Sequence, residues 1–436
     1  MSSAAKRPRV ANEASQRRKV SVIGSSAVHV GNGLLSSIPG EVVPKVKASR
    51  FVIVSDANVW ALYGNKLVEA FLALGNFALP TASNLTGKYG DSTPTAPAGV
   101  ADGKKLLITY QINVGEESKS REVKDAIEDF MLAYKCNRDT CMFALGGGVT
   151  GDLVGFVAST YMRGVPFVQI PTSTMAMIDS SVGGKTAINV PAGKNLIGAF
   201  YQPIDVYADL DLLKSLGKRE IVEGICEAIK MGCIHKPKLF ELLEANPEKV
   251  MNLEPEIINE VIYQSVLGKA EVVAADEKEA GIRATLNWGH TVGHGIEAIK
   301  SPAMMHGECV AIGCVVEGEL ALRMGYDTLT RDKMERVAKC FASYGLPIHV
   351  PAGLDEETMC KKIGMDKKNK GNSIRCTIIT DIGVSIPDPQ PCEWKLIAQV
   401  ISESVAEGAK LPEWQPHEGN HDKTASGNAG GFMGGR

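Results

Sequence analysis

The sequence of 436 residues lacks any apolar run long enough to cross a membrane, so no transmembrane helix and no membrane partner is expected. Its ten cysteines include no Cys-x-x-Cys pair and no regular spacing, which indicates reduced, mostly buried thiols rather than a disulfide framework. A formal net charge of −3 argues against nucleic-acid binding as the main role, so any basic site must be local. With 44% apolar and 22% charged residues, the composition is that of an ordinary globular protein with room for two domains.

The two ends of the chain differ from the rest. Residues 1–19 are polar and basic and contain no apolar segment, so we expect a disordered tail rather than a secretory signal. A cytoplasmic location is the expectation, and a plastid is the alternative if this segment belongs to a transit peptide. Residues 413–436 end in a glycine-rich run and are also expected to be disordered.

The most informative stretch begins where a short apolar run, 142–145, ends in three glycines at 146–148. Gly151 and Asp152 follow, and then an apolar helical pattern. A strand that ends in glycines before a helix leaves backbone N–H groups at a positive helix end, which suits a phosphate or pyrophosphate. A tight turn that needs positive φ explains the same pattern equally well.

A polar cluster follows between Asp179 and Asn195, with Lys185, Lys194 and several glycines between them. Charged and amide side chains interleaved with glycine are unsuited to a protein core. They are suited to holding a polar, anionic small molecule against backbone. Either lysine alone would be a typical solvated surface charge, and only the cluster favours a site.

Strand and helix patterns alternate over residues 20–210, which indicates a parallel sheet covered on both faces. Long helical periods follow over 211–412, with one late strand pattern at 374–380. We therefore expect an α/β fold, with a Rossmann-like parallel-sheet nucleotide-binding domain at 20–210 and a mainly α-helical metal-binding domain at 211–412. Residues 80–105 are rich in Pro, Gly, Ser and Thr and are expected to form a surface loop.

Ligands of such sheets lie at the carboxyl ends of the strands. Asp56 and Asn58 follow the strand pattern 50–55 and so stand at that edge. An acidic side chain there can bind the ribose or amide of a nucleotide, but an Asp after a strand is also typical of a helix cap.

The second domain contains histidines with ligand-like spacing. His290 and His294 are four residues apart, so on a helix they share one face, and His306 follows further along the chain. Glu227 and Lys230 lie one turn apart on an earlier helical pattern. Histidine and carboxylate ligands suit zinc, with an open position in a catalytic site. Spacing alone indicates His290 and His294 as the metal ligands.

Six segments, in order along the chain, resemble the 3-dehydroquinate synthase family of sugar-phosphate cyclases. They are GGGVTGD at 146–152, PTSTMAMIDSSVGGKTAIN at 171–189, GKNLIGAFYQP at 193–203, EGICEAIK at 223–230, LNWGHTVGHGIE at 286–297 and MHGECVAIG at 305–313. The resemblance covers most of residues 20–400. Six matching segments in the order of the family are far more specific than any one motif.

The resemblance implies a set of site residues. The metal ligands would be Glu227, His290 and His306. The catalytic residues would be Lys185, Lys230, Lys269, Arg283, Asn287 and His294. Further substrate contacts would come from Asp179, Lys194, Asn195, Arg163 and Lys367. The dinucleotide would be bound by Asp56, Asn58, Glu116, Lys119, Gly147, Gly148, Val149, Asp152, Thr172, Ser173, Asp179, Ser180, Lys194, Asn195 and Glu220.

The resemblance also implies NAD and Zn²⁺ as cofactors, with Co²⁺ as a substitute, and a homodimer in which Arg163 reaches the neighbouring site. The reaction would convert 3-deoxy-D-arabino-heptulosonate 7-phosphate to 3-dehydroquinate and phosphate, in the shikimate pathway of aromatic amino acid and chorismate biosynthesis. It would proceed by transient oxidation by NAD⁺, β-elimination of phosphate, reduction and an intramolecular aldol closure, without net redox change.

Three other functions would require only some of these site residues. A cyclase of the same family acting on sedoheptulose 7-phosphate would not need to bind a carboxylate, and Arg283, Asn287 and His294 favour the carboxylate-bearing substrate. A metal-dependent polyol dehydrogenase of the same fold would need no array of cations. A catalytically inactive NAD-binding scaffold would need neither that array nor the metal ligands.

Overall fold

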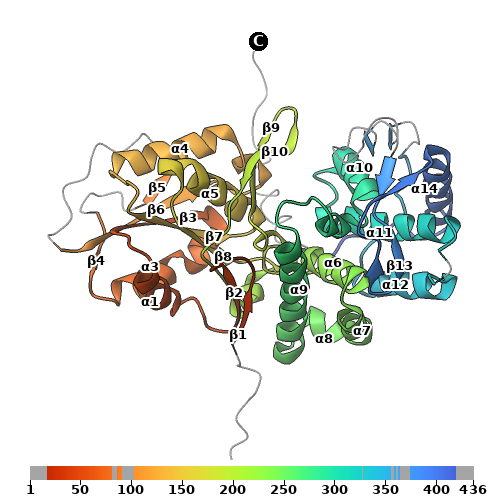
Figure 1. Ribbon diagram of the computed structural model, residues 1–436, viewed down its shortest axis with the longest axis horizontal. Helices are drawn as coiled ribbons and strands as arrows, with labels where there is room; N and C mark the ends of the chain where they lie inside the picture. The colour runs from red at the N-terminus through yellow and green to blue at the C-terminus, as the bar shows by residue number, and fades with distance from the viewer. Residues whose placement is uncertain are drawn as a thin grey trace, which may run out of the picture.

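The computed structural model describes residues 17–80, 86–90, 103–326, 328–354, 358–359, 362–363 and 374–418. Figure 1 shows two lobes, one built on a twisted sheet with helices on both of its faces and one built of helices. The expected fold class, an α/β part built on a mostly parallel sheet followed by a mainly helical part, is thus confirmed. None of the helices in the described ranges is long and apolar enough to span a membrane.

The main sheet has nine strands within the described part of the chain, in the order β1-β2-β11-β8-β7-β3-β6-β4, with β5 beside β6. The pair β1 and β2 is antiparallel, and the other pairs are parallel. The strands are β1 (Arg18–Ser21), β2 (Ala27–Gly31), β3 (Arg50–Asp56), β4 (Phe77–Ala78), β5 (Thr86–Lys88), β6 (Lys105–Ile112), β7 (Thr140–Gly146), β8 (Phe167–Pro171) and β11 (Asp205–Asp209).

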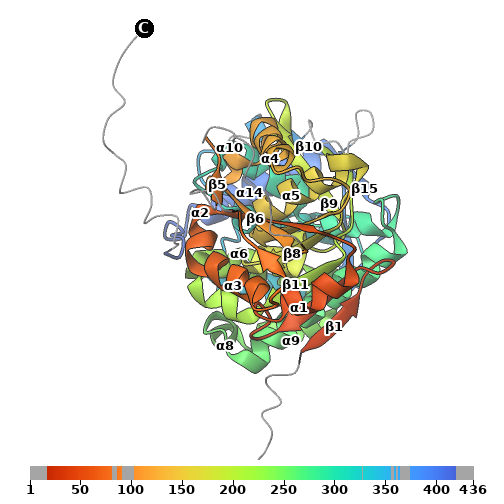
Figure 2. The same ribbon diagram turned by 90° about the vertical axis from the view of Figure 1, so that its left-hand side faces the viewer.

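Both faces of this sheet are buried, which explains the near-continuous apolar runs of its central strands. On β3, Phe51 and Ile53 pack into the core cluster on one face, and Val52 and Val54 pack into the cluster on the other. Figure 2 shows the helices above and below the strands. They are α1 (Ile38–Val42) and α3 (Asn65–Leu72) on one side and α4 (Arg121–Ala133) and α5 (Gly148–Thr160) on the other.

The order of the strands reverses at β3, because β6 pairs with one edge of β3 and the next strand, β7, pairs with the other. In parallel sheets, the crevice at such a reversal, beyond the carboxyl ends of the strands, is where ligands bind. Asp56 ends β3 and Gly146 ends β7, so both residues border this crevice.

A β-hairpin separate from the main sheet carries the polar cluster that follows Asp179. Its strands are β9 (Lys185–Val190) and β10 (Gly193–Phe200), which pair antiparallel. In Figure 1 the hairpin projects above the region where the two lobes meet. Lys194 and Asn195 lie near the start of β10, and the backbone of Asn195 has a φ of +56°.

The second lobe is built of α6 (Lys218–Ile234), α7 (Pro237–Ala245), α8 (Pro247–Met251), α9 (Pro255–Ala275), α10 (His290–Lys300), α11 (His306–Arg323), α12 (Arg331–Ser343) and α14 (Trp394–Gly408). In Figure 1, helices α6 and α9 lie between the lobes. The expected single strand at 374–380 is wrong in detail. It is two short strands, β12 (Ile374–Cys376) and β13 (Ile379–Asp381), which pair with β15 (Gln390–Cys392) and β14 (Val384–Ser385) in separate sheets.

Candidate active site

Three histidines come together where α10 and α11 begin. Their ligand atoms, on His290, His294 and His306, all lie within 4.8 Å of one another. The ring centroid of His290 is 4.9 Å from that of His294 and 5.3 Å from that of His306. This histidine cluster can hold a metal ion.

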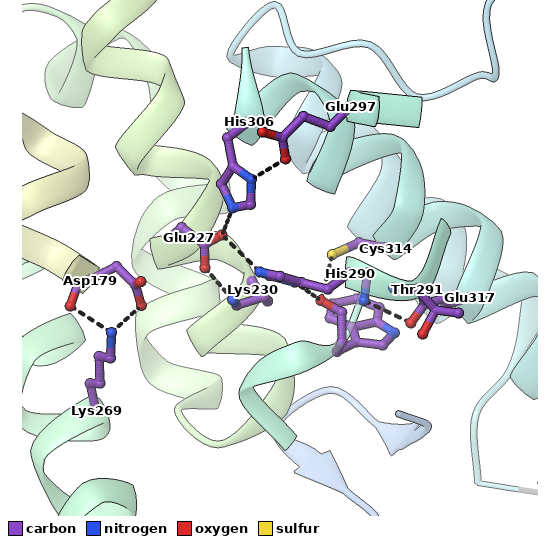
Figure 3. Close-up of polar contacts among 12 residues, drawn as sticks. Asp179, Glu227, Lys230, Lys269, His290, Thr291, Glu297, His306, Cys314 and Glu317 are labelled. Atoms are coloured by element: carbon purple, nitrogen blue, oxygen red, sulfur yellow. Dashed lines mark hydrogen bonds and ion pairs between the residues drawn. The ribbon is translucent and has the colours of Figure 1, made fainter. Parts of the chain in front are cut away.

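A carboxylate from α6 faces the same cluster (Figure 3). Glu227 Oε1 lies 3.6 Å from Nε2 of His306 and 4.0 Å from Nε2 of His290. Both Glu227 oxygens are buried, and neither accepts a hydrogen bond of normal geometry within the described residues. Ligand atoms about 2.1 Å from a tetrahedral zinc ion lie about 3.4 Å apart, so these separations fit a metal with little adjustment.

Two ligand sets therefore remain open, and both include His290 and His306. The spacing argument adds His294, and the family resemblance adds Glu227. Lys230 forms an ion pair with the second oxygen of Glu227, so that side of the carboxylate is neutralised within the protein (Figure 3).

His306 is held between two carboxylates. Its Nδ1 donates a hydrogen bond of 2.9 Å to Glu297, and its Nε2 faces Glu227. Burial disfavours the imidazolium, but the contacts with Glu227 and Glu297 raise the pKa of His306 to about 10. A metal ion must displace that proton, so metal binding here is coupled to proton release.

Opposite charges pair at the boundary between the lobes. Lys269, on α9, donates to the side chain of Asp179 at 2.7 Å (Figure 3). Burial opposes the charge of Asp179, but Lys269 and Lys230 lower its pKa below the ordinary range. Burial also lowers the pKa of the Lys269 ammonium, in spite of Asp179.

Several residues expected to bind substrate already contact protein groups. Lys185 forms an ion pair with one oxygen of Glu279, and Asn287 donates to the other at 2.7 Å. Arg283 is 1% exposed, and it donates to the backbone oxygens of Gly183, at 3.0 Å, and Glu277. The guanidinium also lies 5.6 Å from the ring centroid of Phe200.

The glycine turn has the features of an anion cradle. The N-cap of α5 is Gly147, so no side chain caps the amides at this helix end. A Cβ on Gly148 would lie 2.9 Å from Oγ of Ser180, which leaves room there for backbone only. That Ser180 hydroxyl is buried and has no hydrogen-bond partner in the described structure. Bare amides beside an unsatisfied hydroxyl fit the pyrophosphate of a dinucleotide.

Side chains next to this turn form one polar network. Lys119 Nζ donates to Asp152 and to Asn195, each at 2.5 Å. Asn189 donates to Glu116 at 2.7 Å and accepts from the backbone N–H of Asn195 at 3.0 Å. Burial raises the pKa of Asp152, and Lys119 opposes that shift.

The other expected dinucleotide contacts border the same crevice. Oδ1 of Asp56 accepts the N–H groups of Asn58 and Val59, both at 3.0 Å, so the helix-cap interpretation is confirmed and a further contact with a nucleotide stays a prediction. Thr172 donates its N–H to Gly146 at 3.0 Å. The remaining positions are Val149 in the first turn of α5, Ser173 just after β8, and Glu220 in the first turn of α6.

Two expected substrate residues stand apart from this site. Arg163 lies beyond the far end of α5, whose 13 residues separate it from the glycine turn by about 20 Å. This distance agrees with the expectation that Arg163 contacts the site of a neighbouring subunit, which stays a prediction. Lys367 lies outside the described residues.

The structure adds three side chains that the sequence interpretation did not name. Asn189 and Glu297 lie within segments that carry the family resemblance, so their positions held a signal. Glu279 lies in a loop with no motif, and its backbone φ of +59° is unusual for a residue other than glycine. Only the folded arrangement shows that it pairs with Lys185 and Asn287.

A nucleotide-type crevice beside a histidine and carboxylate cluster defines the class of α/β enzymes that combine a dinucleotide lobe with a metal-binding helical lobe. Models of the 3-dehydroquinate synthase N-terminal and C-terminal families match residues 109–223 and 224–369. The chain belongs to the 3-dehydroquinate synthase family.

Curated relatives agree with this assignment. The chain is 39% identical over 387 residues to the pentafunctional AROM polypeptide of Scheffersomyces stipitis, and 41% identical over 389 residues to pentafunctional AROM polypeptide 1 of Lodderomyces elongisporus. Each match covers 84% of this chain and 23% of the relative. The chain thus spans about a quarter of the length of these relatives.

Solved structures share the fold. A 2-deoxy-scyllo-inosose synthase complexed with carbaglucose-6-phosphate, NAD⁺ and Co²⁺ has a TM-score of 0.75 and 22% identity, and the match covers 89% of this chain and all of that one. The 2-epi-5-epi-valiolone synthase ValA of Streptomyces hygroscopicus, with NAD⁺ and Zn²⁺ bound, has a TM-score of 0.73 and 25% identity over 89% and 98% of the two chains. A glycerol dehydrogenase from Schizosaccharomyces pombe has a TM-score of 0.60 and 17% identity over 92% and 98%.

Proposed function

We propose that the chain converts 3-deoxy-D-arabino-heptulosonate 7-phosphate to 3-dehydroquinate and phosphate in the shikimate pathway. The observation that carries the proposal is that charge pairs join the glycine-turn lobe to the metal-side lobe. Lys269 pairs with Asp179, and Lys194 of the hairpin pairs with Glu297 of α10 at 2.8 Å. A substrate bound between the lobes would meet the dinucleotide crevice on one side and the histidine cluster on the other.

The cofactors we propose are NAD and Zn²⁺, with Co²⁺ as a substitute. The bare amides of α5 and the unsatisfied Ser180 hydroxyl support the first. The buried, unsatisfied Oε1 of Glu227, facing His290 and His306, supports the second. Zinc would polarise a hydroxyl or carbonyl oxygen as a Lewis acid, and NAD⁺ would take up and return a hydride.

The side chains of this protein would bind and orient the substrate. Lys194, Lys185 and Arg283 supply positive charge for its phosphate and carboxylate. Glu279 now holds Lys185 and Asn287, so a substrate anion would replace the Glu279 carboxylate at both donors. Lys185 would then neutralise the substrate anion in place of Glu279.

The same arrangement separates the competing functions. A polyol dehydrogenase would release one NADH per turnover and would not need Lys185, Lys194 and Arg283 together. A cyclase acting on sedoheptulose 7-phosphate would have no carboxylate for Arg283, and the burial of that guanidinium favours the carboxylate-bearing substrate. An inactive scaffold would bind neither metal nor substrate.

We also propose a homodimer in which Arg163 contacts the phosphate site of the neighbouring subunit, and a cytoplasmic location, with a plastid as the alternative. The distance of Arg163 from the glycine turn of its own chain supports the dimer. Sedimentation of the purified protein would test the assembly.

One experiment tests the activity. The zinc-loaded protein would be given the heptulosonate phosphate with a trace of NAD⁺, and phosphate, dehydroquinate and NADH would be measured together. We expect one phosphate and one dehydroquinate per substrate without accumulation of NADH. Turnover of sedoheptulose 7-phosphate instead, or NADH formed in step with oxidation of a polyol, would contradict the proposal.

A further inference from the structure

Glu317 is a fully buried carboxylate on α11, with 0% of its surface exposed, and no step proposed above uses it. Its Oε2 accepts the N–H of Gly289 at 2.8 Å. Its Oε1 accepts those of Thr291 and Val292 at 2.9 and 3.1 Å (Figure 3). These amides belong to the N-terminus of α10, where a helix leaves its first N–H groups without intrahelical partners.

The cap of α10 comes from another helix because its own N-cap residue cannot carry a side chain. Gly289 has a φ of +81°, and a Cβ there would lie 2.4 Å from Sγ of Cys314 and 2.9 Å from the backbone oxygen of Val310. The close approach of α10 and α11 therefore excludes a Ser or Asp cap. Glu317 supplies the acceptors instead, and its negative charge suits the positive end of α10.

A single peptide group links Glu317 to His290. The N–H of the peptide between Trp288 and Gly289 donates to Glu317, and its C=O lies 3.2 Å from Nδ1 of His290. A carbonyl oxygen only accepts, so this hydrogen bond requires the proton on Nδ1 and leaves the lone pair of a neutral ring on Nε2. Nε2 is the atom that faces Glu227 at 4.0 Å.

We propose that Glu317 is a positioning residue for His290, acting through the Trp288–Gly289 peptide on the ring's orientation and tautomer and on the basicity of Nε2. A carboxylate that accepts the N–H of a peptide polarises it and strengthens its carbonyl as an acceptor. The carbonyl then holds the proton on Nδ1 more firmly, as outer partners of metal-binding histidines do. The inference rests on the proposed role of His290 as a metal ligand.

Glu317→Gln tests the link with little change of shape. The amide offers one acceptor oxygen in place of two, so its NH₂ group must face an N–H of the α10 terminus. The matched control is Glu319→Gln, the same change on the same helix at a carboxylate that pairs with Arg323 and Arg331 near the surface. Both variants would be checked for thermal unfolding, where Glu317→Gln is expected to lose more stability than Glu319→Gln because its NH₂ group faces a buried N–H. NAD⁺ binding would also be measured, and neither variant is expected to alter it.

Two measurements would be made. Zinc affinity, by competition with a chelator, should fall about 10- to 100-fold in Glu317→Gln and stay within about twofold of wild type in Glu319→Gln. In the zinc-free protein, ¹⁵N NMR of the neutral His290 ring should show the Nδ1–H tautomer. The Glu317→Gln variant should show a mixture of tautomers, which a loss of stability alone would not produce.

The outcomes separate this inference from the proposed function. If His290→Ala loses zinc while Glu317→Gln keeps wild-type affinity and a single tautomer, the positioning role is wrong and the metal site stands. If His290→Ala keeps its zinc, the metal assignment itself is wrong. Should Glu317→Gln not fold, the wild-type spectrum still decides, because a His290 ring protonated on Nε2 overturns the inference.

Discussion

Lys194 and Glu297 form an ion pair of 2.8 Å between the β9–β10 hairpin and α10. The second oxygen of Glu297 accepts the hydrogen bond from Nδ1 of His306. One carboxylate therefore contacts a lysine proposed to bind the substrate and a histidine proposed to bind zinc. A substrate anion that takes Lys194 would leave Glu297 with His306 alone, so occupancy of the two lobes is electrostatically linked.

We expect Glu297→Gln to weaken zinc binding by about 10- to 100-fold, because the amide is a poorer acceptor for the Nδ1 proton of His306. Lys194→Met is the matched control, since it breaks the same ion pair from the other side. It should leave zinc affinity within a few-fold of wild type and raise the KM for the sugar phosphate. Equal loss of zinc in both variants would mean that the ion pair, not the hydrogen bond to His306, holds the metal site.

His290→Ala should lower zinc affinity well over tenfold and remove activity, because a site with three protein ligands cannot spare one. His294→Ala distinguishes the two ligand sets. If Glu227 is the third ligand, the His294 variant keeps zinc and loses activity. Metal analysis after dialysis, beside the turnover assay, checks both. Full metal content and activity in His290→Ala would refute the assignment.

Gly148→Val should abolish NAD⁺ binding while the helical lobe stays folded. A Cβ at this position meets Oγ of Ser180 at 2.9 Å, so a branched side chain must fill the space in front of the α5 amides. Gly40→Val is the control, because a Cβ there meets no atom within 4 Å. Calorimetric titration gives both affinities. Unchanged NAD⁺ affinity in Gly148→Val would show that the pyrophosphate lies elsewhere.

The patterns that could be predicted are those with strong periodicity. α11 (His306–Arg323) begins and ends where its helical pattern does, because apolar residues face the core along its whole length. The β7 to α5 turn was predictable for a similar reason, since a buried strand, a glycine run and a helix each leave a distinct local signal. The histidine spacing likewise placed His290 and His294 on one helix.

The features that could not be predicted depend on contacts between segments distant in sequence. The β9–β10 hairpin is half exposed, and Lys, Asn and Gly residues interrupt its apolar residues, so no regular apolar alternation marks its strands. Glu279 pairs with Lys185 from 94 positions away. The three acceptor bonds of Glu317 likewise depend on the packing of α11 against α10, which no local pattern reveals.

Glu223→Gln should stabilise the zinc-free protein at alkaline pH. Burial raises the pKa of Glu223 to about 7, assisted by Glu308 and opposed by His306. The folded chain thus retains a proton that the unfolded chain loses near its ordinary pKa of 4.5, so stability falls as pH rises from about 4.5 to 7. The glutamine has no such fall, and its advantage should be on the order of 3 kcal/mol at pH 8 and near zero at pH 4.

Thermal unfolding of both proteins at the two pH values would measure this difference. Glu319→Gln, which removes a carboxylate paired with arginines, is the control and should not gain stability as pH rises. An equal gain for Glu223→Gln at pH 4 and pH 8 would show that the carboxyl of Glu223 does not titrate in this range.

Arg283→Ala addresses substrate choice. Arg283 is buried and donates to backbone oxygens of both lobes, Gly183 on one side and Glu277 on the other. Its Nε has no hydrogen-bond partner within the described residues, so the guanidinium keeps a donor for a ligand. A planar fork that binds a substrate carboxylate by charge-assisted hydrogen bonds would be lost in the alanine variant. We expect transition-state binding of the carboxylate substrate to weaken by about 2–5 kcal/mol.

The accompanying measurements decide what such a loss means. Zinc content should hold, because Arg283 contacts none of the proposed ligands in the structure described, and NAD⁺ affinity should change little. Arg283→Lys is the matched variant, since it keeps the charge without the fork and should recover only part of kcat/KM. With sedoheptulose 7-phosphate, which has no carboxylate, both variants should resemble wild type. A small kinetic loss, or one matched by loss of zinc, would make Arg283 a structural link between the lobes and remove the main support for the carboxylate-bearing substrate.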